Sequence, residues 1–139
     1  MEIQKVRFVK CSWVLVAVLG ATVMLAACGG EPTVDPLEIG DPERGREIFE
    51  TGGGVLTGDG CIKCHSLDGS ENVAPTMLGI SARAGERVPG LSAVDYLRQS
   101  IVDPRAYFVE GFPLPMSTQL RNILSEEDID ALVAFLLTQ

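Results

Sequence analysis

The C-terminal end of the chain has the clearest pattern of polar and apolar positions. Ser125 precedes three acidic residues, and apolar residues then recur every three or four positions, at Ile129, Leu132, Val133, Leu136 and Leu137. A serine that can cap the first turn, acidic side chains near the helix N-terminus and this spacing predict an amphipathic helix over residues 125–137. Phe135 flanks the apolar stripe, so we expect this helix to pack against a core.

A second helix is predicted from Asp41 to about Glu50. Asp41 can cap it, and Pro42 suits the first helical position. Gly45 and Phe49 are four residues apart and share a face of this helix. A glycine inside a helix costs about 1 kcal/mol relative to alanine, so Gly45 suggests that another backbone passes close by. A tolerated surface glycine is the alternative.

A third helix is predicted between Ser92, which can cap it, and about Val102, because Asp103 and Pro104 end the pattern. Its apolar side holds Val94, Leu97 and Ile101, with Tyr96 and Val102 as further candidates.

The N-terminus has the layout of an export signal. Three basic residues lie within residues 1–10, residues 13–24 are almost wholly apolar, and Leu25-Ala26-Ala27-Cys28 follows. This ending resembles the lipobox of bacterial lipoproteins, and the resemblance implies that Cys28 becomes the lipid-modified mature N-terminus. A transmembrane anchor is the alternative, but the apolar run over residues 11–28 falls short of the roughly 20 residues that a spanning helix needs. Either way, we expect an exported protein held at the periplasmic or outer face of a bacterial membrane.

The residues after Cys28 predict a short linker. Residues 29–40 contain two prolines, three glycines and three acidic residues, a composition typical of a flexible tether. The sequence therefore predicts a signal peptide over residues 1–27, a lipid-anchored linker over 28–40 and one domain over 41–139.

The charge of the chain changes sign along its length. The formal net charge is −8, but three of the 11 basic residues and only one of the 19 acidic residues lie within residues 1–27, which leaves −10 for the rest. An acidic domain argues against binding to nucleic acid, which requires cationic patches. The negative charge serves solubility, or it steers docking onto a basic partner protein.

Cys61-Ile62-Lys63-Cys64-His65 is the most informative stretch of the sequence. Two thiols at this spacing can form thioethers with the two vinyl groups of one porphyrin, and the histidine that follows can then ligate the iron. The motif therefore predicts one covalently bound c-type haem, attached through Cys61 and Cys64, with His65 as the proximal iron ligand.

Three other interpretations fit the motif less well. A thioredoxin-like dithiol normally follows a strand, whereas the loop over residues 51–60 is rich in glycine. A structural zinc site needs four ligands, and His65 is the only histidine in the chain. A disulfide between Cys61 and Cys64 would leave His65 without a role.

Other residues are candidates to support the haem. A proximal histidine normally donates its free ring N–H to an acceptor, and the carbonyl of Pro75 is our candidate, with a plain turn proline as the alternative. Met116, in a proline-rich segment, is predicted to be the sixth ligand, because a thioether suits low-spin haem iron. Met77 follows His65 by only 12 residues, and we expect it to pack against the haem or the core. Either Arg83 or Arg87 could pair with the haem propionates, with solvated surface charge as the alternative.

Taken in order, these features resemble a small class I cytochrome c over residues 40–139. The resemblance implies an all-α fold of three to five helices wrapped around one covalently attached haem, with the first and last helices crossing at Gly45 and with Phe49 near Phe135. The chain departs from the family in its long glycine-rich loop and in having Pro-Met where Met-Pro is commoner. A lipobox followed by one such domain also resembles monohaem lipoprotein subunits of bacterial respiratory complexes, including alternative complex III.

The expected function is electron transfer rather than enzymatic catalysis. A membrane-anchored one-electron carrier of this kind would serve a respiratory or photosynthetic chain, between a quinol-oxidising complex and a terminal oxidase or reaction centre, or as a subunit of a larger complex. Two alternatives remain: a haem enzyme or gas sensor with an open sixth position, and a non-haem lipoprotein that uses its dithiol. The first lacks a second histidine to act as a distal acid–base group.

Overall fold

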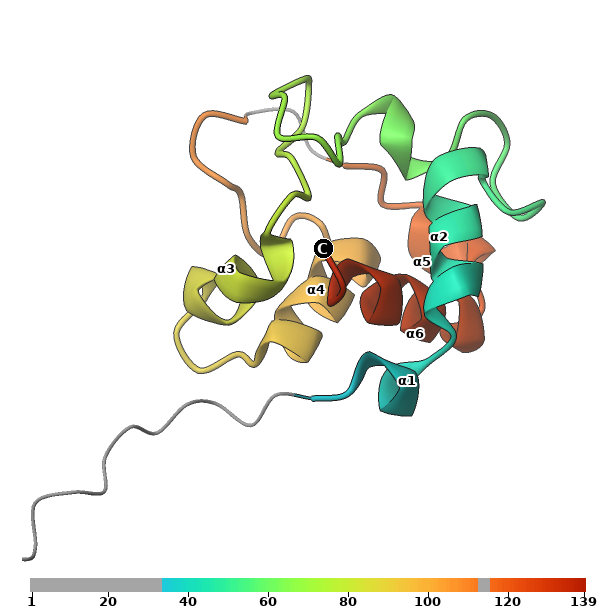
Figure 1. The fold of residues 1–139 in the computed structure, drawn as a ribbon. Helices are drawn as coiled ribbons and strands as arrows, with labels where there is room; N and C mark the ends of the chain where they lie inside the picture. Colours follow the sequence, from blue (N-terminus) through green and yellow to red (C-terminus); the bar gives the residue numbers. More distant parts are fainter. Residues whose placement is uncertain (1–33, 113–115) are drawn as a thin grey trace, which may run out of the picture. The chain divides into compact units, whose positions relative to one another are not determined.

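The structure is a computed structural model that describes residues 34–112 and 116–139 (Figure 1). Within these ranges the chain forms helices and no strand, so the all-α fold expected from the sequence is confirmed. The elements are α1 (Pro36–Ile39), α2 (Pro42–Thr51), the 3-10 helix η1 (Cys61–Lys63), α3 (Ile80–Arg87), α4 (Ala93–Val102), α5 (Leu120–Ile123) and α6 (Glu126–Leu136). None of the described helices is long and apolar enough to cross a bilayer.

Helices α2 and α6 pack against each other through Gly45. A Cβ atom at Gly45 would overlap the carbonyl oxygen of Ala131 and would lie 2.8 Å from the Cβ of Phe135. One turn further along α2, the rings of Phe49 and Phe135 lie 5.4 Å apart between centroids. Figure 1 shows α2 standing across one end of α6. The close approach predicted from Gly45 is therefore present, and a surface glycine is excluded.

Helix α6 supplies most of the core, as its apolar stripe predicted. The helix packs against both α2 and α4. The largest side chains that are fully buried are Ile129 and Val133 of α6 and Ile48 of α2. Burying a side chain of this size contributes roughly 1.5–3 kcal/mol. The helix starts with a capping box, in which Ser125 and Asp128 each bond the other's backbone N–H.

The predicted boundary between the linker and the domain differs from the structure. The stretch expected to be a linker contains α1, which begins with Asp35 accepting a hydrogen bond from the Leu37 N–H. This Asp-Pro start is the same signal that begins α2. Ile39 packs against the core, and Gly40 lies so close to α6 that a Cβ there would be 2.7 Å from the carbonyl carbon of Asp130. The packed domain therefore includes residues 36–40. The predicted signal peptide and Cys28 lie outside the described residues.

Helices α3 and α5 were not predicted. Helix α3 follows Gly79, which has a left-handed backbone (φ 67°) and gives no side-chain cap, and only Ile80 and Ala84 are buried on it. Helix α5 spans one turn and likewise has no side-chain cap. Without a cap or an apolar stripe, the local sequence carries little helix signal, and tertiary packing decides the conformation.

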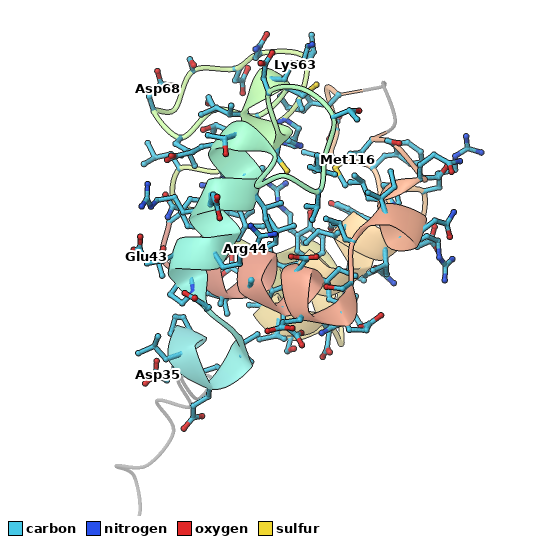
Figure 2. The ribbon with its side chains drawn as sticks, turned by 90° about the vertical axis from the view of Figure 1, so that its right-hand side faces the viewer. Asp35, Glu43, Arg44, Lys63, Asp68 and Met116 are labelled. Carbon is cyan, nitrogen blue, oxygen red and sulfur yellow. The ribbon has the colours of Figure 1, made fainter. Side chains whose placement is uncertain are left out.

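Arg44 joins three parts of the fold. Its guanidinium donates hydrogen bonds to Asp128 at the start of α6 (3.1 Å), to Glu47 (2.8 Å) and to the carbonyl of Gly53 (2.8 Å). Figure 2 shows Arg44 at the junction of α2 and α6. Burial opposes ionisation of Asp128, but the hydrogen bonds from Ser125 and Arg44 outweigh it and place the pKa of Asp128 below its usual range.

We expect Asp128→Asn to lower stability at neutral pH, and the loss to shrink in acid. Because the pKa of Asp128 is lower in the folded than in the unfolded state, its stabilising effect is complete above the unfolded pKa, about 3.9, and disappears as the pH falls through the folded pKa. The expected loss is roughly 0.5–1 kcal/mol, typical of an acid in a first helical turn. Urea unfolding of both proteins between about pH 7 and 2.5 measures it. A difference that stays constant with pH would contradict the prediction.

Candidate functional site

A cavity of about 460 Å³ lies between the helices and the loops that connect them. Its size falls within the range of small-molecule and cofactor sites, and most of its lining is apolar. The residues of chemical interest that line it are Cys61, Cys64, His65, Met77, Arg87 and Met116. The cavity thus brings together both cysteines and the histidine of the Cys-x-x-Cys-His motif and both downstream methionines.

The motif is held on one tight turn. The N–H groups of Cys64 and His65 both donate to the carbonyl of Cys61, at 3.1 and 3.0 Å. Gly60, just before this turn, has φ 67°, and a Cβ there would lie 2.5 Å from the carbonyl oxygen of Phe49. Only glycine fits this combination of a left-handed backbone and close contact with the end of α2. The glycine-rich loop thus lets η1 pack against α2 with Cys61 at the cavity.

His65 is oriented by a backbone carbonyl. Its Nδ1 donates to the carbonyl oxygen of Pro75 at 2.8 Å, which is the contact the sequence suggested. This hydrogen bond places the proton on Nδ1 and leaves the lone pair of Nε2 available for a metal. Burial lowers the pKa of His65 and outweighs the opposing effect of the Pro75 hydrogen bond, so the ring is neutral at neutral pH. Neutral imidazole is the form that binds iron.

The two cysteines are free thiols and differ in their surroundings. Cys61 is half-buried, whereas Cys64 is exposed. Burial, and then the neighbouring Cys64, raise the pKa of Cys61 to about 11. A thiol with such a pKa is a weak nucleophile at neutral pH, which disfavours a reactive dithiol. Within the part of the chain that the structure describes, no three His, Cys, Asp or Glu side chains are grouped to hold a metal ion, so a zinc site is also disfavoured.

Both methionines line the cavity, but their backbones belong to different segments. The Met77 N–H donates to the carbonyl of Ser66 at 2.8 Å, which holds Met77 beside the residue that follows His65. Met116 comes from the segment before α5, far from His65 in sequence, and is labelled in Figure 2. Its lead-in, residues 113–115, lies outside the described residues. The two methionines therefore reach the cavity from different segments, Met77 from beside His65 and Met116 from before α5.

The two candidate arginines, Arg83 and Arg87, also have different surroundings. Arg83 donates to the carbonyls of Leu78 and Thr76, at 2.5 and 3.1 Å, and so braces the loop after His65. Arg87 lines the cavity. The structure therefore separates two residues that the sequence treated alike.

Aromatic side chains around the cavity were largely missed from the sequence. The rings of Tyr96 and Tyr107 meet edge to face, with centroids 5.9 Å apart, and both line the cavity together with Phe108. Tyr107 is 37% exposed and Phe108 is 50% exposed. Exposed aromatic side chains at the rim of an apolar cavity fit a large flat ligand that would cover them. The only local signal was the run of aromatic residues before Met116.

The comparison with known families agrees with this site. The model of the family described as cytochrome c matches residues 42–139. No curated protein matches the chain. Members of that family carry a covalently attached c-type haem, and the apolar cavity, the thiols of Cys61 and Cys64, and the oriented ring of His65 fit that group. Because the match spans well over half of the chain, this protein belongs to the cytochrome c family and binds a covalent c-type haem.

Proposed function

We propose that this protein is a membrane-anchored one-electron carrier with His65 and Met116 as the axial ligands of its haem. The observation that carries the proposal is that both side chains line the same apolar cavity, with His65 held by Pro75 so that Nε2 is available. The haem, when bound, supplies an iron that accepts and releases one electron. The chain attaches it through Cys61 and Cys64 and shields it from water.

The cavity lining favours electron transfer over catalysis at the iron. Among the described residues, the lining contains no Asp or Glu, and His65 is the only histidine of the chain. A peroxidase-type enzyme needs a distal group that moves protons, and neither a carboxylate nor a second imidazole is available for that role. A second axial ligand from Met116 would also leave no open position for a substrate or a gas.

The N-terminal sequence supports the anchoring part of the proposal. The apolar segment that ends in Leu-Ala-Ala-Cys28 would export the protein and attach lipid to Cys28. The acidic domain would then work at a bacterial membrane surface, where it exchanges electrons with a quinol-oxidising complex and a terminal oxidase or reaction centre, as a mobile carrier or as a subunit. A net charge of −10 after residue 27 suits docking onto basic surfaces of such partners.

The first experiment combines a haem stain on a denaturing gel with optical spectra. The mature protein, produced in a host that assembles c-type cytochromes, should stain. It should also show a sharp α band when reduced and a weak sulfur-to-iron band when oxidised. Haem stays on the denatured chain in the gel only through its thioether bonds to Cys61 and Cys64. Cys64→Ser removes one of these two bonds, so it should reduce the stain strongly. A stained protein without the sulfur band, whose spectrum changes with carbon monoxide, would instead indicate an open iron.

Cys28→Ser is the matched control, since it also replaces one cysteine by serine. It should leave the haem stain and the spectra unchanged and abolish incorporation of a labelled fatty acid. A labelled Cys28→Ser protein would disprove lipid attachment at Cys28, whatever the result for the haem.

A further inference from the structure

Helix α1 ties the N-terminal end of the described chain to the body of the domain. Ile39 packs against the core, and Gly40 lies so close to α6 that a Cβ there would be 2.7 Å from the carbonyl carbon of Asp130. The first turn of α1 is held by a side-chain cap at Asp35. The chain is therefore fixed to the domain from about residue 35 onward, closer to Cys28 than the linker predicted from the sequence.

Chain length alone limits the distance between the proposed lipid anchor and α1. Cys28 precedes Val34 by six residues. A chain of six residues spans at most about 20 Å even when it is fully extended. A lipid at Cys28 that enters a bilayer would therefore keep α1 within this distance of the bilayer surface.

The end of the domain nearest the anchor exposes apolar side chains. Leu37 is 73% exposed, the largest fraction among the large hydrophobic side chains of the described residues, and Val34 is 43% exposed. Neither lines the cavity, so bound haem would leave both exposed. Asp35 and Glu38 flank Leu37, and carboxylates do not enter hydrocarbon, which confines any contact with lipid to the headgroup level.

We propose that Val34 and Leu37 form a membrane contact, through which α1 lies on the surface of the bilayer that holds the lipid of Cys28. This inference rests on the lipid anchoring proposed above. Burial of one or two apolar side chains is too weak to bind a protein to a membrane by itself. Attachment through Cys28 makes the contact intramolecular, so a small gain from burying Leu37 is sufficient.

The membrane contact would also orient the haem. Helix α2 separates α1 from η1, and its ten residues extend about 15 Å along the helix axis. Figures 1 and 2 show these two elements at opposite ends of α2, with Asp35 and Lys63 labelled in Figure 2. With α1 on the bilayer, the turn that carries Cys61 faces away from the lipid, where a domain of a membrane-bound partner can approach it.

The test is the reactivity of a thiol placed in the membrane contact. In the mature protein the thiols of Cys61 and Cys64 are bonded to haem and Cys28 carries lipid, so Val34→Cys introduces the one free thiol. Its rate of modification by a charged, membrane-impermeant maleimide is measured on the haem protein bound to phosphatidylcholine vesicles. Leu37→Gln in this background should raise the rate roughly five- to tenfold, because leucine no longer holds α1 on the bilayer.

Ile123→Gln is the matched control, because Ile123 is also an exposed apolar side chain but follows α4, on the short helix α5. It should leave the rate unchanged. On Cys28→Ser protein in solution without vesicles, Leu37→Gln should also have no effect. An effect there would overturn the proposal, because Leu37 would then shield the thiol within the domain.

Two further results would overturn the membrane contact. One is an equal rate with and without Leu37→Gln on protein that floats with the vesicles and has intact haem spectra. The other is protection that disappears when the protein is spread thinly over the vesicles, because a second copy of the chain would then cover Leu37. Failure of the anchoring itself is recognised separately: protein that carries no labelled fatty acid and does not float would disprove lipid attachment at Cys28, and the contact with it.

Discussion

Gly45→Ala is expected to separate α2 from α6 and to lower stability by about 3 kcal/mol or more, which is a large fraction of the roughly 5–15 kcal/mol that stabilises a typical domain. The new Cβ would overlap the carbonyl oxygen of Ala131, which is backbone and cannot rotate away. The helices would have to move apart, and the contacts of Ile48 and Phe49 with α6 would loosen. Alanine is the better helix former, so a loss of stability would come from the contact and not from helix propensity.

Denaturant unfolding and the yield of haem-stained protein measure this effect. The matched control is Gly54→Ala, which makes the same substitution at a position where the new Cβ would have no neighbouring atom within 4 Å. Its left-handed backbone (φ 77°) should make alanine cost only about 1–2 kcal/mol. Gly45→Ala with a stability equal to that of wild type would show that α2 and α6 can shift without loss, which contradicts the role assigned to Gly45.

Met116→Ala is expected to lower the reduction potential by on the order of 100 mV or more and to abolish the sulfur-to-iron band. Thioether ligation stabilises the reduced iron, and axial ligands set haem potentials over a range of about 0.8 V. The loss of one ligand should also let carbon monoxide bind readily. Optical spectra and redox titration of the covalently attached haem measure these changes without any partner protein.

Met77→Ala is the control, because Met77 lines the same cavity and is equally a methionine. Its backbone is held beside Ser66, next to the proximal histidine, so its loss should reduce stability and leave the band and the potential nearly unchanged. The reverse result, with the band lost only in Met77→Ala, would transfer the sixth ligand to Met77.

Several parts of the fold could be predicted because their signals are local. Helices α2, α4 and α6 each begin with a capping residue, Asp41, Ser92 or Ser125, and their boundaries agree with the prediction to within about two residues. Gly45 was informative because glycine inside a helix has few explanations other than close packing. Helix α1 carried the same Asp-Pro signal, but the surrounding prolines and glycines suggested a linker, and only its contact with α6 shows that it belongs to the domain.

The sequence by itself determined which groups bind the haem covalently and which histidine lies next to it, because thiols and imidazole at that spacing have few other uses. Only the tertiary structure decided how residues from distant segments divide the remaining roles. It placed Arg83 on backbone carbonyls and Arg87 in the cavity, although both lie on the same short helix. It also shows that Met77 is hydrogen-bonded to Ser66, next to His65, and that Met116 lines the cavity from the segment before α5. Such assignments depend on the direction of each side chain and on packing between segments far apart in the chain, which local composition and spacing do not encode.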